Sequence, residues 1–406
     1  MKEKEINKKL IFNKYKIKKL IAKSPFSLLY EGINIKNNEP VAMKFEKKTN
    51  EFNYLESEAF ILFNLKGFGI QKVITYGKNI CYNILIEELL GLSIKDLWKV
   101  KMSKKELLKN ICMIGLQIID RLQYIHSKDI IHKDIKPNNF LIGRKDPKNI
   151  YLIDFGFSQK YRSTRTGKHI QLRKAKIICG SLDYLSINGN KGFTLSRRDD
   201  LESLAYVIIS LALNSLPWSK IIFTKENKTK AIIETYRMKN SITAEKLCEG
   251  LPNEFAEFLN YTKKLDFEQE PNYEYLKNLL TSVLLKNQQI NDYLFFWIIN
   301  KKNKKKEQEN KVERINTLRR KDSSQKRLYN NIKKSLEKIK VNELQSPNNN
   351  NDVFYLKKRN IHPYKSFTNF SQGINENYQK IRIIKNNSQI NTITDKKKNS
   401  NKWNFN

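Results

Sequence analysis

A group of polar residues with the types and spacing for chemistry lies in the middle of the chain. The segment from His132 through Asp134 to Asn139 is followed, fifteen residues after Asn139, by the triplet that begins at Asp154, Asp-Phe-Gly. Asp134 is a candidate base, and Asn139 and Asp154 carry the oxygen atoms that hard cations such as Mg²⁺ prefer. Phosphoryl transfer from a nucleotide needs this set, because a hydroxyl must be oriented and the charge of the triphosphate neutralised. The order and interval of the two motifs make the prediction specific, whereas a lone Asp-Phe-Gly triplet would be weak.

A lysine for the phosphates is expected upstream. Residues 41–44 read Val-Ala-Met-Lys and predict a strand that ends in Lys44. A lysine that points inward from a strand needs a counter-charge. The helix predicted at 54–65 can supply it from Glu56 or Glu58. A lysine held in this way would reach the α- and β-phosphates of a nucleotide.

The elements that must position these residues change in type near residue 90. Short apolar runs typical of strands come first, with a single helical stretch among them. The strand runs occupy 15–21, 28–33, 41–45, 73–76 and 80–86, and the helical stretch occupies 54–65. Helices then dominate: Ser103 and Glu106 form a capping box before 107–125, and a second helix at 201–213 is stopped by Pro217. We therefore predict an α+β fold with two lobes, a small β-rich one and a larger helical one, and a cleft between them.

The bulk composition favours a soluble intracellular protein. The chain has 406 residues, of which 39% are hydrophobic, enough for a substantial core. Its four cysteines form no C-x-x-C pair, which argues for a reducing compartment and against a disulfide framework or a zinc site. The N-terminus has no apolar signal core, and the most apolar stretch, 201–218, is interrupted by polar residues and predicts a buried helix. We expect a cytoplasmic or nuclear protein, without a membrane anchor and monomeric.

A basic, polar tail is predicted from residue 300 onward. Residues 300–406 contain 27 Lys or Arg and 9 Asp or Glu, a net charge of +18, which is half of the +36 of the whole chain. Such a composition predicts disorder or a solvent-exposed helix, and 311–340 has apolar residues at helical spacing. The charge either reflects a Lys-rich composition or serves to bind an acidic partner or nucleic acid.

Four sequence segments resemble the casein kinase I family of protein kinases. They are Ile-His-Lys-Asp-Ile-Lys-Pro-Asn-Asn-Phe-Leu-Ile-Gly at 131–143, Ser-Ile-Asn at 186–188, Ser-Arg-Arg-Asp-Asp-Leu-Glu-Ser at 196–203 and Ser-Leu-Pro-Trp at 215–218. The resemblance covers residues 13–298 and implies a bilobal protein-kinase-like fold. It implies an N-terminal extension at 1–12 and a kinase domain at 13–299, with the tail at 300–406. Within the domain the N-lobe would be 13–87, the linker 88–91 and the C-lobe 92–299.

The resemblance also implies a role for each matching residue. Asp134 would be the catalytic base, Lys136 would contact the γ-phosphate, and Asn139 and Asp154 would hold Mg²⁺. Lys44 would bind the phosphates of ATP with Glu56 as its partner, the better match of the two glutamates. The nucleotide would be bound by Ile21, Ala22, Ser24, Ser27, Leu29, Ala42, Lys44, Glu56, Glu88 and Leu90. Asp200 would brace the catalytic loop, and the serines of the tail match regulatory phosphorylation sites.

The nucleotide loop departs from the family pattern. Ala22, Ser24 and Ser27 stand where glycines let the backbone approach the phosphates, and Pro25 removes a donor N–H. We expect a weakened affinity for ATP.

Glu87 is a second departure, because the family usually has an apolar residue just before the linker. A buried carboxylate needs a partner, and Lys44 is the nearest candidate. Such a pair would draw Lys44 away from the phosphates, so that Met at position 87 would raise nucleotide affinity.

Two further departures concern the substrate side of the cleft. Lys133 replaces the usual arginine and keeps its charge but not its planar fork. Many relatives in the family lack the activation-loop phosphate that such an arginine would hold, so we expect little effect. Asp183 replaces an arginine of the pocket that gives the family its preference for phosphorylated or acidic substrates. Because Asp183 would repel a phosphate, we expect that preference to be lost, even if Lys225, Lys228 or Lys230 keeps part of the pocket.

The sequence therefore predicts a serine/threonine protein kinase that uses ATP and Mg²⁺ and acts on protein substrates. The alternative is a kinase-fold scaffold or binding protein that is catalytically weak or inactive. The altered loop and Glu87 favour the alternative, whereas the retained catalytic set favours the enzyme.

Overall fold

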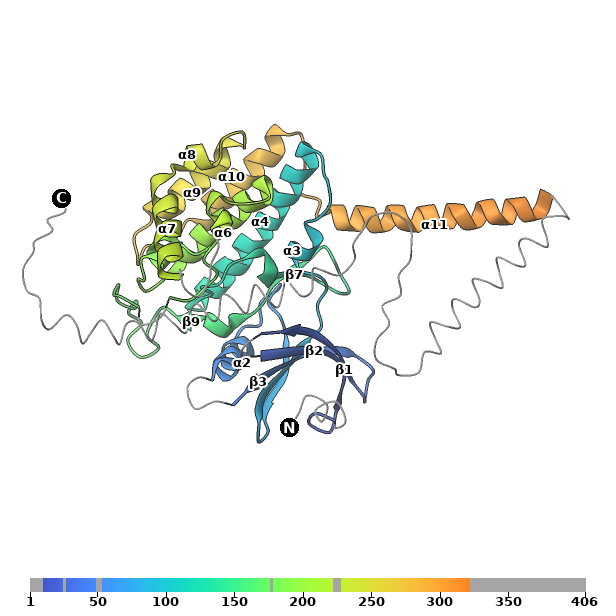
Figure 1. The fold of residues 1–406 in the computed structure, drawn as a ribbon, viewed down its shortest axis with the longest axis horizontal. Helices are drawn as coiled ribbons and strands as arrows, with labels where there is room; N and C mark the ends of the chain where they lie inside the picture. Colours follow the sequence, from blue (N-terminus) through green and yellow to red (C-terminus); the bar gives the residue numbers. More distant parts are fainter. Residues whose placement is uncertain (1–9, 25–26, 49–52, 176–177, 222–227, 322–406) are drawn as a thin grey trace, which may run out of the picture. The chain divides into compact units, whose positions relative to one another are not determined.

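The computed structural model describes residues 10–24, 27–48, 53–175, 178–221 and 228–321. The first half of the domain is a five-stranded antiparallel sheet with the strand order β1-β2-β3-β5-β4 (Figure 1). Its strands are β1 (Tyr15–Lys23), β2 (Ser27–Asn34), β3 (Pro40–Lys47), β4 (Val73–Lys78) and β5 (Tyr82–Glu88). Helix α2 (Tyr54–Asn64) contacts β3, β4 and β5. All five strands and the helix were predicted.

One face of the sheet has its own apolar core. Val41, Met43 and Phe45 of β3 pack there with Ile84 and Ile86 of β5. Alternation along the strands sends the residues between them to the opposite face, toward α2. The predicted strand at 80–86 begins two residues later than expected, because Ile80 is almost fully exposed in the turn before β5.

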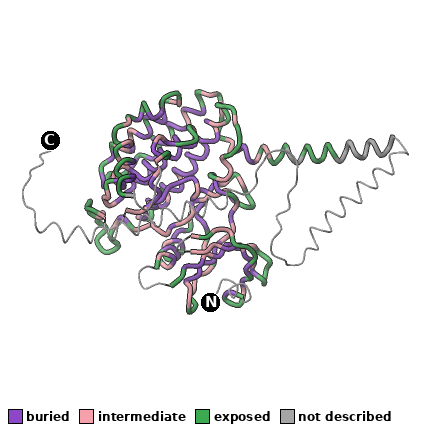
Figure 2. The backbone as a smooth tube through the Cα atoms, in the orientation of Figure 1, coloured by how far each residue is buried: buried purple, intermediate pink, exposed green. Residues whose placement is uncertain are grey.

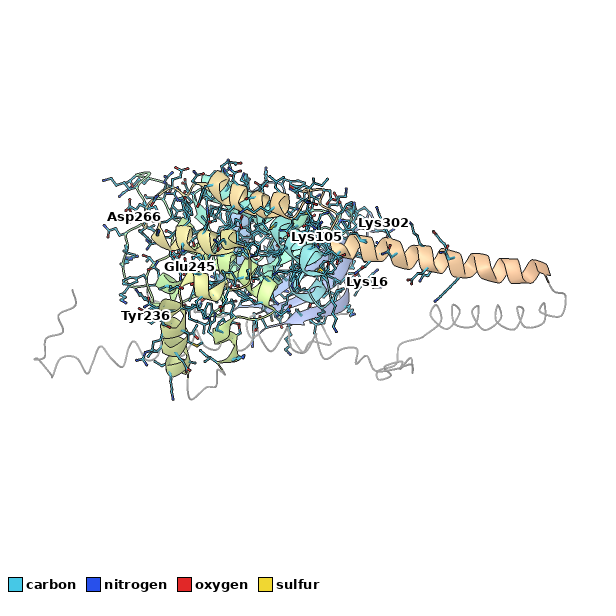
Figure 3. All side chains as sticks on the ribbon, turned by 90° about the horizontal axis from the view of Figure 1, so that it is seen from above. Lys16, Lys105, Tyr236, Glu245, Asp266 and Lys302 are labelled. Atoms are coloured by element: carbon cyan, nitrogen blue, oxygen red, sulfur yellow. The ribbon has the colours of Figure 1, made fainter. Side chains whose placement is uncertain are left out.

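Helices build most of the second lobe. They are α3 (Ile94–Leu97), α4 (Lys104–Ser127), α5 (Ile187–Asn190), α6 (Arg197–Leu213), α7 (Lys228–Ser241), α8 (Ala244–Leu247), α9 (Asn253–Lys264) and α10 (Tyr273–Lys286). Buried residues run along α4 and α6 (Figure 2), which contact each other, and α10 and α9 pack against them in turn. The capping box of Ser103 and Glu106 opens α4 as predicted. The α+β fold with a β-sheet N-lobe and a helical C-lobe is confirmed; Figure 3 marks the sheet by Lys16 and the helices by Tyr236 and Glu245.

Short elements between α4 and α5 carry the chemical motifs. They are β6 (Ile130–Ile131), η1 (Pro137–Asn139), β7 (Phe140–Ile142), β8 (Ile150–Leu152), η2 (Phe155–Phe157) and β9 (Gln159–Lys160), with η3 (Pro217–Lys220) after α6. The hairpin of β7 and β8 separates the two motifs, and β6 pairs with β9. Phe140 and Leu152, which face each other in the hairpin, are fully buried. The hairpin therefore anchors Asn139 and Asp154 to the core of the helical lobe.

A separate structural unit begins at Leu294 and contains helix α11 (Phe296–Lys321). Phe295 and Trp297 stack within it, with ring centroids 4.2 Å apart. The side chains described from 301 to 311 are exposed, so this part of the predicted tail is a solvent-exposed helix. Residues 322–406, including the predicted regulatory serines, lie outside the described residues. In the described ranges, no helix has the length and apolar character to span a membrane.

Candidate active site

Lys44 connects the two lobes of the site. It lies on the face of β3 opposite the apolar core, because its neighbours Met43 and Phe45 occupy that core. Its Nζ donates to Oε2 of Glu58 at 2.7 Å and to Oδ1 of Asp154 at 2.9 Å. Residues 110 positions apart in the sequence thus meet at one ammonium group. This is the geometry needed to fix a lysine beside a triphosphate.

The prediction that Glu56 is the partner of Lys44 was wrong, because Glu58 takes that role. Glu56 accepts from Nζ of Lys78 at 2.7 Å in a pair that is nearly half exposed, whereas Glu58 is 2% exposed. Residues two apart on a helix point to different sides, so only one of these glutamates can face the cleft. The sequence held a signal for Glu58, which shares the helix face of the buried Leu55 and Leu62.

The catalytic loop holds Asp134 through both oxygens of its carboxylate. Oδ1 accepts from the backbone N–H and the hydroxyl of Ser181, both at 2.9 Å. Oδ2 accepts from Nζ of Lys136 at 2.6 Å and from Nδ2 of Asn139 at 3.3 Å. The carboxylate is buried but faces four donors, so a hydroxyl that approaches it would meet an oriented acceptor. Ser181 was not predicted as a site residue, because it lies 47 residues from Asp134 and has no motif around it.

Asp200 braces this loop as predicted. Its carboxylate accepts from the backbone N–H groups of His132 and Lys133, both at 2.8 Å, and from Nε2 of His126 at 2.9 Å. Lys133 has a positive φ of 69°, a conformation that side chains with a Cβ seldom adopt. The buried carboxylate of Asp200 therefore holds a strained turn next to Asp134.

Asp154 and Asn139 fit a hard cation by their donor atoms. Although removal from solvent raises the pKa of Asp154, Lys44 and Lys136 lower that pKa to about 2, which keeps the carboxylate ionised. Nδ2 of Asn139 donates to the backbone oxygen of Asp134 at 2.9 Å, an orientation that leaves Oδ1 free for a metal. Within the described ranges, no three His, Cys, Asp or Glu residues are grouped to hold a metal by themselves. Mg²⁺ here would take its remaining ligands from phosphates and water.

The comparison with protein families decides the assignment. The family model of the protein kinase domain matches residues 15–289. The chain belongs to the protein kinase family. A protein kinase domain implies, in general, the use of ATP and a divalent metal, and the residues around Lys44 and Asp154 suit both.

The nucleotide loop of this kinase is closed by its own serines. Oγ of Ser24 accepts from the N–H of Ser27 at 2.9 Å, and the N–H of Ser24 donates to the oxygen of Ser27 at 2.8 Å. Both N–H groups, which in a glycine-rich loop would face phosphates, are therefore engaged within the loop. The cavity between the loop and Asp154 has a volume of about 30 Å³, which holds little more than one water. Pro25 lies outside the described residues.

Three of the remaining predicted nucleotide residues, Ala22, Leu29 and Ala42, lie on the face of the sheet that carries Lys44. Ala22, Leu29 and Lys44 are consecutive register partners across β1, β2 and β3. Ala42 and Leu90 are buried, and Ile21 and Leu29 are partly exposed. The carboxylate of Glu88 accepts from the N–H of Lys72 at 2.8 Å, which fixes the start of the linker.

Glu87 does not pair with Lys44 as expected. It is 3% exposed, and in the part of the chain that the structure describes its Oε1 has no hydrogen-bond partner. Burial, reinforced by Glu58 and opposed by Lys44, raises the pKa of Glu87 to about 8. Lys44 is held by Glu58 and Asp154, so the reason to expect a gain in affinity from Glu87→Met no longer applies.

The raised pKa of Glu87 predicts a pH-dependent stability. The unfolded chain loses this proton near pH 4.5 and the folded chain near pH 8, so the free energy of unfolding should fall as the pH rises between these values. Glu87→Gln should remove the contribution of this group to the fall of the unfolding free energy with pH. The variant should therefore be more stable than the native protein at pH 8 by roughly a few kcal/mol, with little difference at pH 4.5. Urea unfolding at both pH values measures this. If the unfolding free energies of the two proteins change equally between these pH values, Glu87 is ionised in the folded protein.

Proposed function

We propose that this kinase transfers the γ-phosphate of ATP to serine and threonine hydroxyls of proteins, in the manner of the casein kinase I family. The observation that carries the proposal is the pair of contacts from Lys44 to Glu58 and Asp154, at 2.7 and 2.9 Å. They join the sheet, α2 and the catalytic loop region in the arrangement that phosphoryl transfer requires. Mg²⁺ would neutralise the charge that develops on the phosphates.

The protein's own groups would orient the reactants. Asp134 would accept the hydrogen bond of the attacking hydroxyl and take its proton as the bond to the γ-phosphorus forms, while the bond from that phosphorus to the bridging oxygen breaks and ADP leaves. Lys136, 2.6 Å from that carboxylate, lies where it could hold the transferred group in line. Ser181 and Asn139 keep the Asp134 carboxylate in one orientation, so that little reorganisation is needed during the reaction.

Contacts between the sequence segments of the family support the finer assignment. Asp199 accepts from the hydroxyl of Ser186 at 2.6 Å, and Glu202 accepts from the N–H of Ile187 at 2.9 Å. The Ser-Ile-Asn and Ser-Arg-Arg-Asp-Asp-Leu-Glu-Ser segments that resemble casein kinase I thus bind each other. Together they fix the stretch of chain that follows Ser181.

Substrate choice should differ from that of the family, because Asp183 reverses a charge. We expect peptides phosphorylated upstream of the target serine to react no faster than unphosphorylated ones. Asp183→Arg should raise the ratio of the two rates about tenfold, since an arginine can hold a phosphate by charge-assisted bonds. Initial rates with the two peptides and acid hydrolysis of the product measure this ratio and identify the modified residue. A strong preference of the native protein for the phosphorylated peptide would contradict the predicted effect of Asp183, and a product containing only phosphotyrosine would contradict the assignment to serine and threonine.

A kinase-fold scaffold with little or no activity is the second candidate. The engaged N–H groups of Ser24 and Ser27 and the small cavity beside Asp154 favour it, because a triphosphate has to displace these contacts. Calorimetric titration with ATP and Mg²⁺ separates the candidates: a scaffold gives no heat of binding at millimolar nucleotide.

The setting of the kinase is proposed from its composition. Four free cysteines suit a reducing compartment, the cytoplasm or the nucleus. We propose a monomer whose basic tail is available to an acidic protein partner or to nucleic acid.

A further inference from the structure

One side of helix α2 exposes large apolar side chains to solvent. Phe60 is 66% exposed and Phe63 is 47% exposed, and residues three apart are neighbours on a helix surface. The side of α2 that faces the core is apolar as well, through Leu55 and Leu62. A helix that is apolar toward the core and toward solvent is usually covered on both sides. The exposed side of α2 therefore has the character of an interface.

A groove lies between this side of α2 and the helical lobe. Its volume is about 610 Å³, within the range of sites that enclose several groups of a ligand. The elements α2 and β9, which both border it, lie side by side in Figure 1. We name it the α2 groove, and the residues of α2 that line it are Glu56, Ser57, Phe60, Ile61 and Asn64.

The opposite wall of the α2 groove is apolar at Ile130 and positively charged at Lys128 and Lys160. Both lysines are exposed, and neither forms an ion pair with any residue in the ranges that the structure describes. Glu56, on the α2 side of the groove, is already paired with Lys78 at 2.7 Å. This wall therefore attracts a segment that carries negative charge.

The spacing of the α2 side chains suits a second helix. Phe60, Ile61 and Asn64 follow Ser57 at intervals of three, four and seven residues, which places the four in one row along α2. Ser57 and Asn64 are smaller than Phe60, so there is space on both sides of its ring. Large side chains three or four residues apart on another helix fit such spaces, as ridges fit into grooves.

We propose that the α2 groove binds an amphipathic helix of another protein, with large apolar side chains on one face and aspartate or glutamate where it meets Lys128 and Lys160. The apolar side chains would cover Phe60 and Phe63 and pack against Ile130. The carboxylates would lie beside the two lysines, so that binding weakens as the salt concentration rises. This surface lies outside the nucleotide cleft, so its binding does not depend on phosphate transfer.

The test begins with peptides whose sequence is not chosen in advance. A phage-displayed library of random peptides of about 16 residues, roughly four helical turns, would be selected on the full-length chain. The enriched peptides would be synthesised with a fluorescent label, and their affinity measured by fluorescence anisotropy. They should have large apolar residues three or four apart and a net negative charge. Their affinity should fall at least about threefold between about 50 mM and about 300 mM salt.

A matched pair of variants tests the apolar contact. Phe60→Gln should weaken the peptides about tenfold, because a large aromatic group at the centre of an interface contributes much of the affinity. Phe68→Gln is the control, since Phe68 is also 66% exposed but does not line the groove. It should change the affinity less than about twofold. Thermal melting first shows that both variants are folded.

A second pair tests the charge. Lys128→Gln combined with Lys160→Gln should weaken the peptides about fivefold and remove most of the salt dependence. Lys16→Gln combined with Lys18→Gln changes the net charge equally at exposed positions of β1 and should alter neither property.

A photoreactive benzoylphenylalanine in place of Phe60 identifies the occupant of the groove. Irradiation of the full-length chain should crosslink this position to the selected peptide. A crosslink only within the chain, or only to a second copy, would overturn the proposal, because the protein itself would then fill the groove. The proposal is also wrong if no selected peptide loses affinity in Phe60→Gln, or if Phe68→Gln weakens binding as much. It is wrong as well if the peptides that depend on Phe60 carry no acidic residue.

Discussion

Glu58→Gln is expected to lower the rate of phosphate transfer about a hundredfold, whereas Glu56→Gln should change it less than about twofold. Glu58 is the buried anion that holds Nζ of Lys44 at 2.7 Å, and its loss lets the lysine move away from the phosphates. A displacement of about 1 Å near a reacting group is enough for such a loss. Glu56 lies on the same helix, but its bond to Lys78 is nearly half exposed and contributes little.

The two variants control for each other because both remove one carboxylate from α2. Initial rates with casein as substrate and the ADP affinity of each variant are the measurements. Because Glu58 and not Glu56 pairs with Lys44, Glu58→Gln alone should lose transfer rate and ADP affinity. Similar losses for the two variants would mean that the helix, and not the contact with Lys44, is what matters.

Lys239→Met is expected to destabilise the fold by about 3 kcal/mol or more. Lys239 of α7 is 1% exposed and donates to the backbone oxygens of Leu182 and Leu185, both at 2.7 Å, and to Oδ1 of Asn190 at 3.1 Å. Methionine fills a similar volume but leaves three buried acceptors without a donor. The segment that loses its support directly follows Ser181, so transfer activity should also fall.

The control for this prediction is Lys246→Met. Lys246 pairs with Glu249, and both side chains are 71% exposed, so its loss should change the free energy of unfolding by less than about 0.5 kcal/mol. Urea unfolding of the three proteins measures both effects. If Lys239→Met unfolds at the same urea concentration as the native chain, the three bonds contribute no net stability.

Residues within short motifs were predictable from the sequence, because the local chain fixes their spacing. Asp134, Lys136 and Asn139 lie in one loop and its first turn, and the structure brings them within hydrogen-bonding distance. Asp154 follows after a hairpin, whose length sets the interval.

Contacts that depend on the orientation of a helix or on distant loops were not predictable in the same way. Glu56 and Glu58 differ by about half a turn of α2. The resemblance to the family indicated Glu56 as the partner of Lys44, but Glu56 is the more exposed of the two. Ser181 reaches Asp134 from a segment without a regular pattern. The predicted pair of Glu87 with Lys44 is not formed, because the carboxylates of Glu58 and Asp154 already bind the ammonium group of Lys44.

Phosphate transfer from labelled ATP to casein, and to the protein itself, tests the central claim most directly. The native chain and Asp154→Asn would be compared with Mg²⁺ or Mn²⁺ present, after thermal melting has shown that both are folded. A kinase that tolerates a loop without glycine should transfer phosphate, and the variant should lose at least about a hundredfold of the rate because the ionised metal ligand is gone. No transfer by the folded native chain above that of Asp154→Asn would contradict catalysis and support the scaffold.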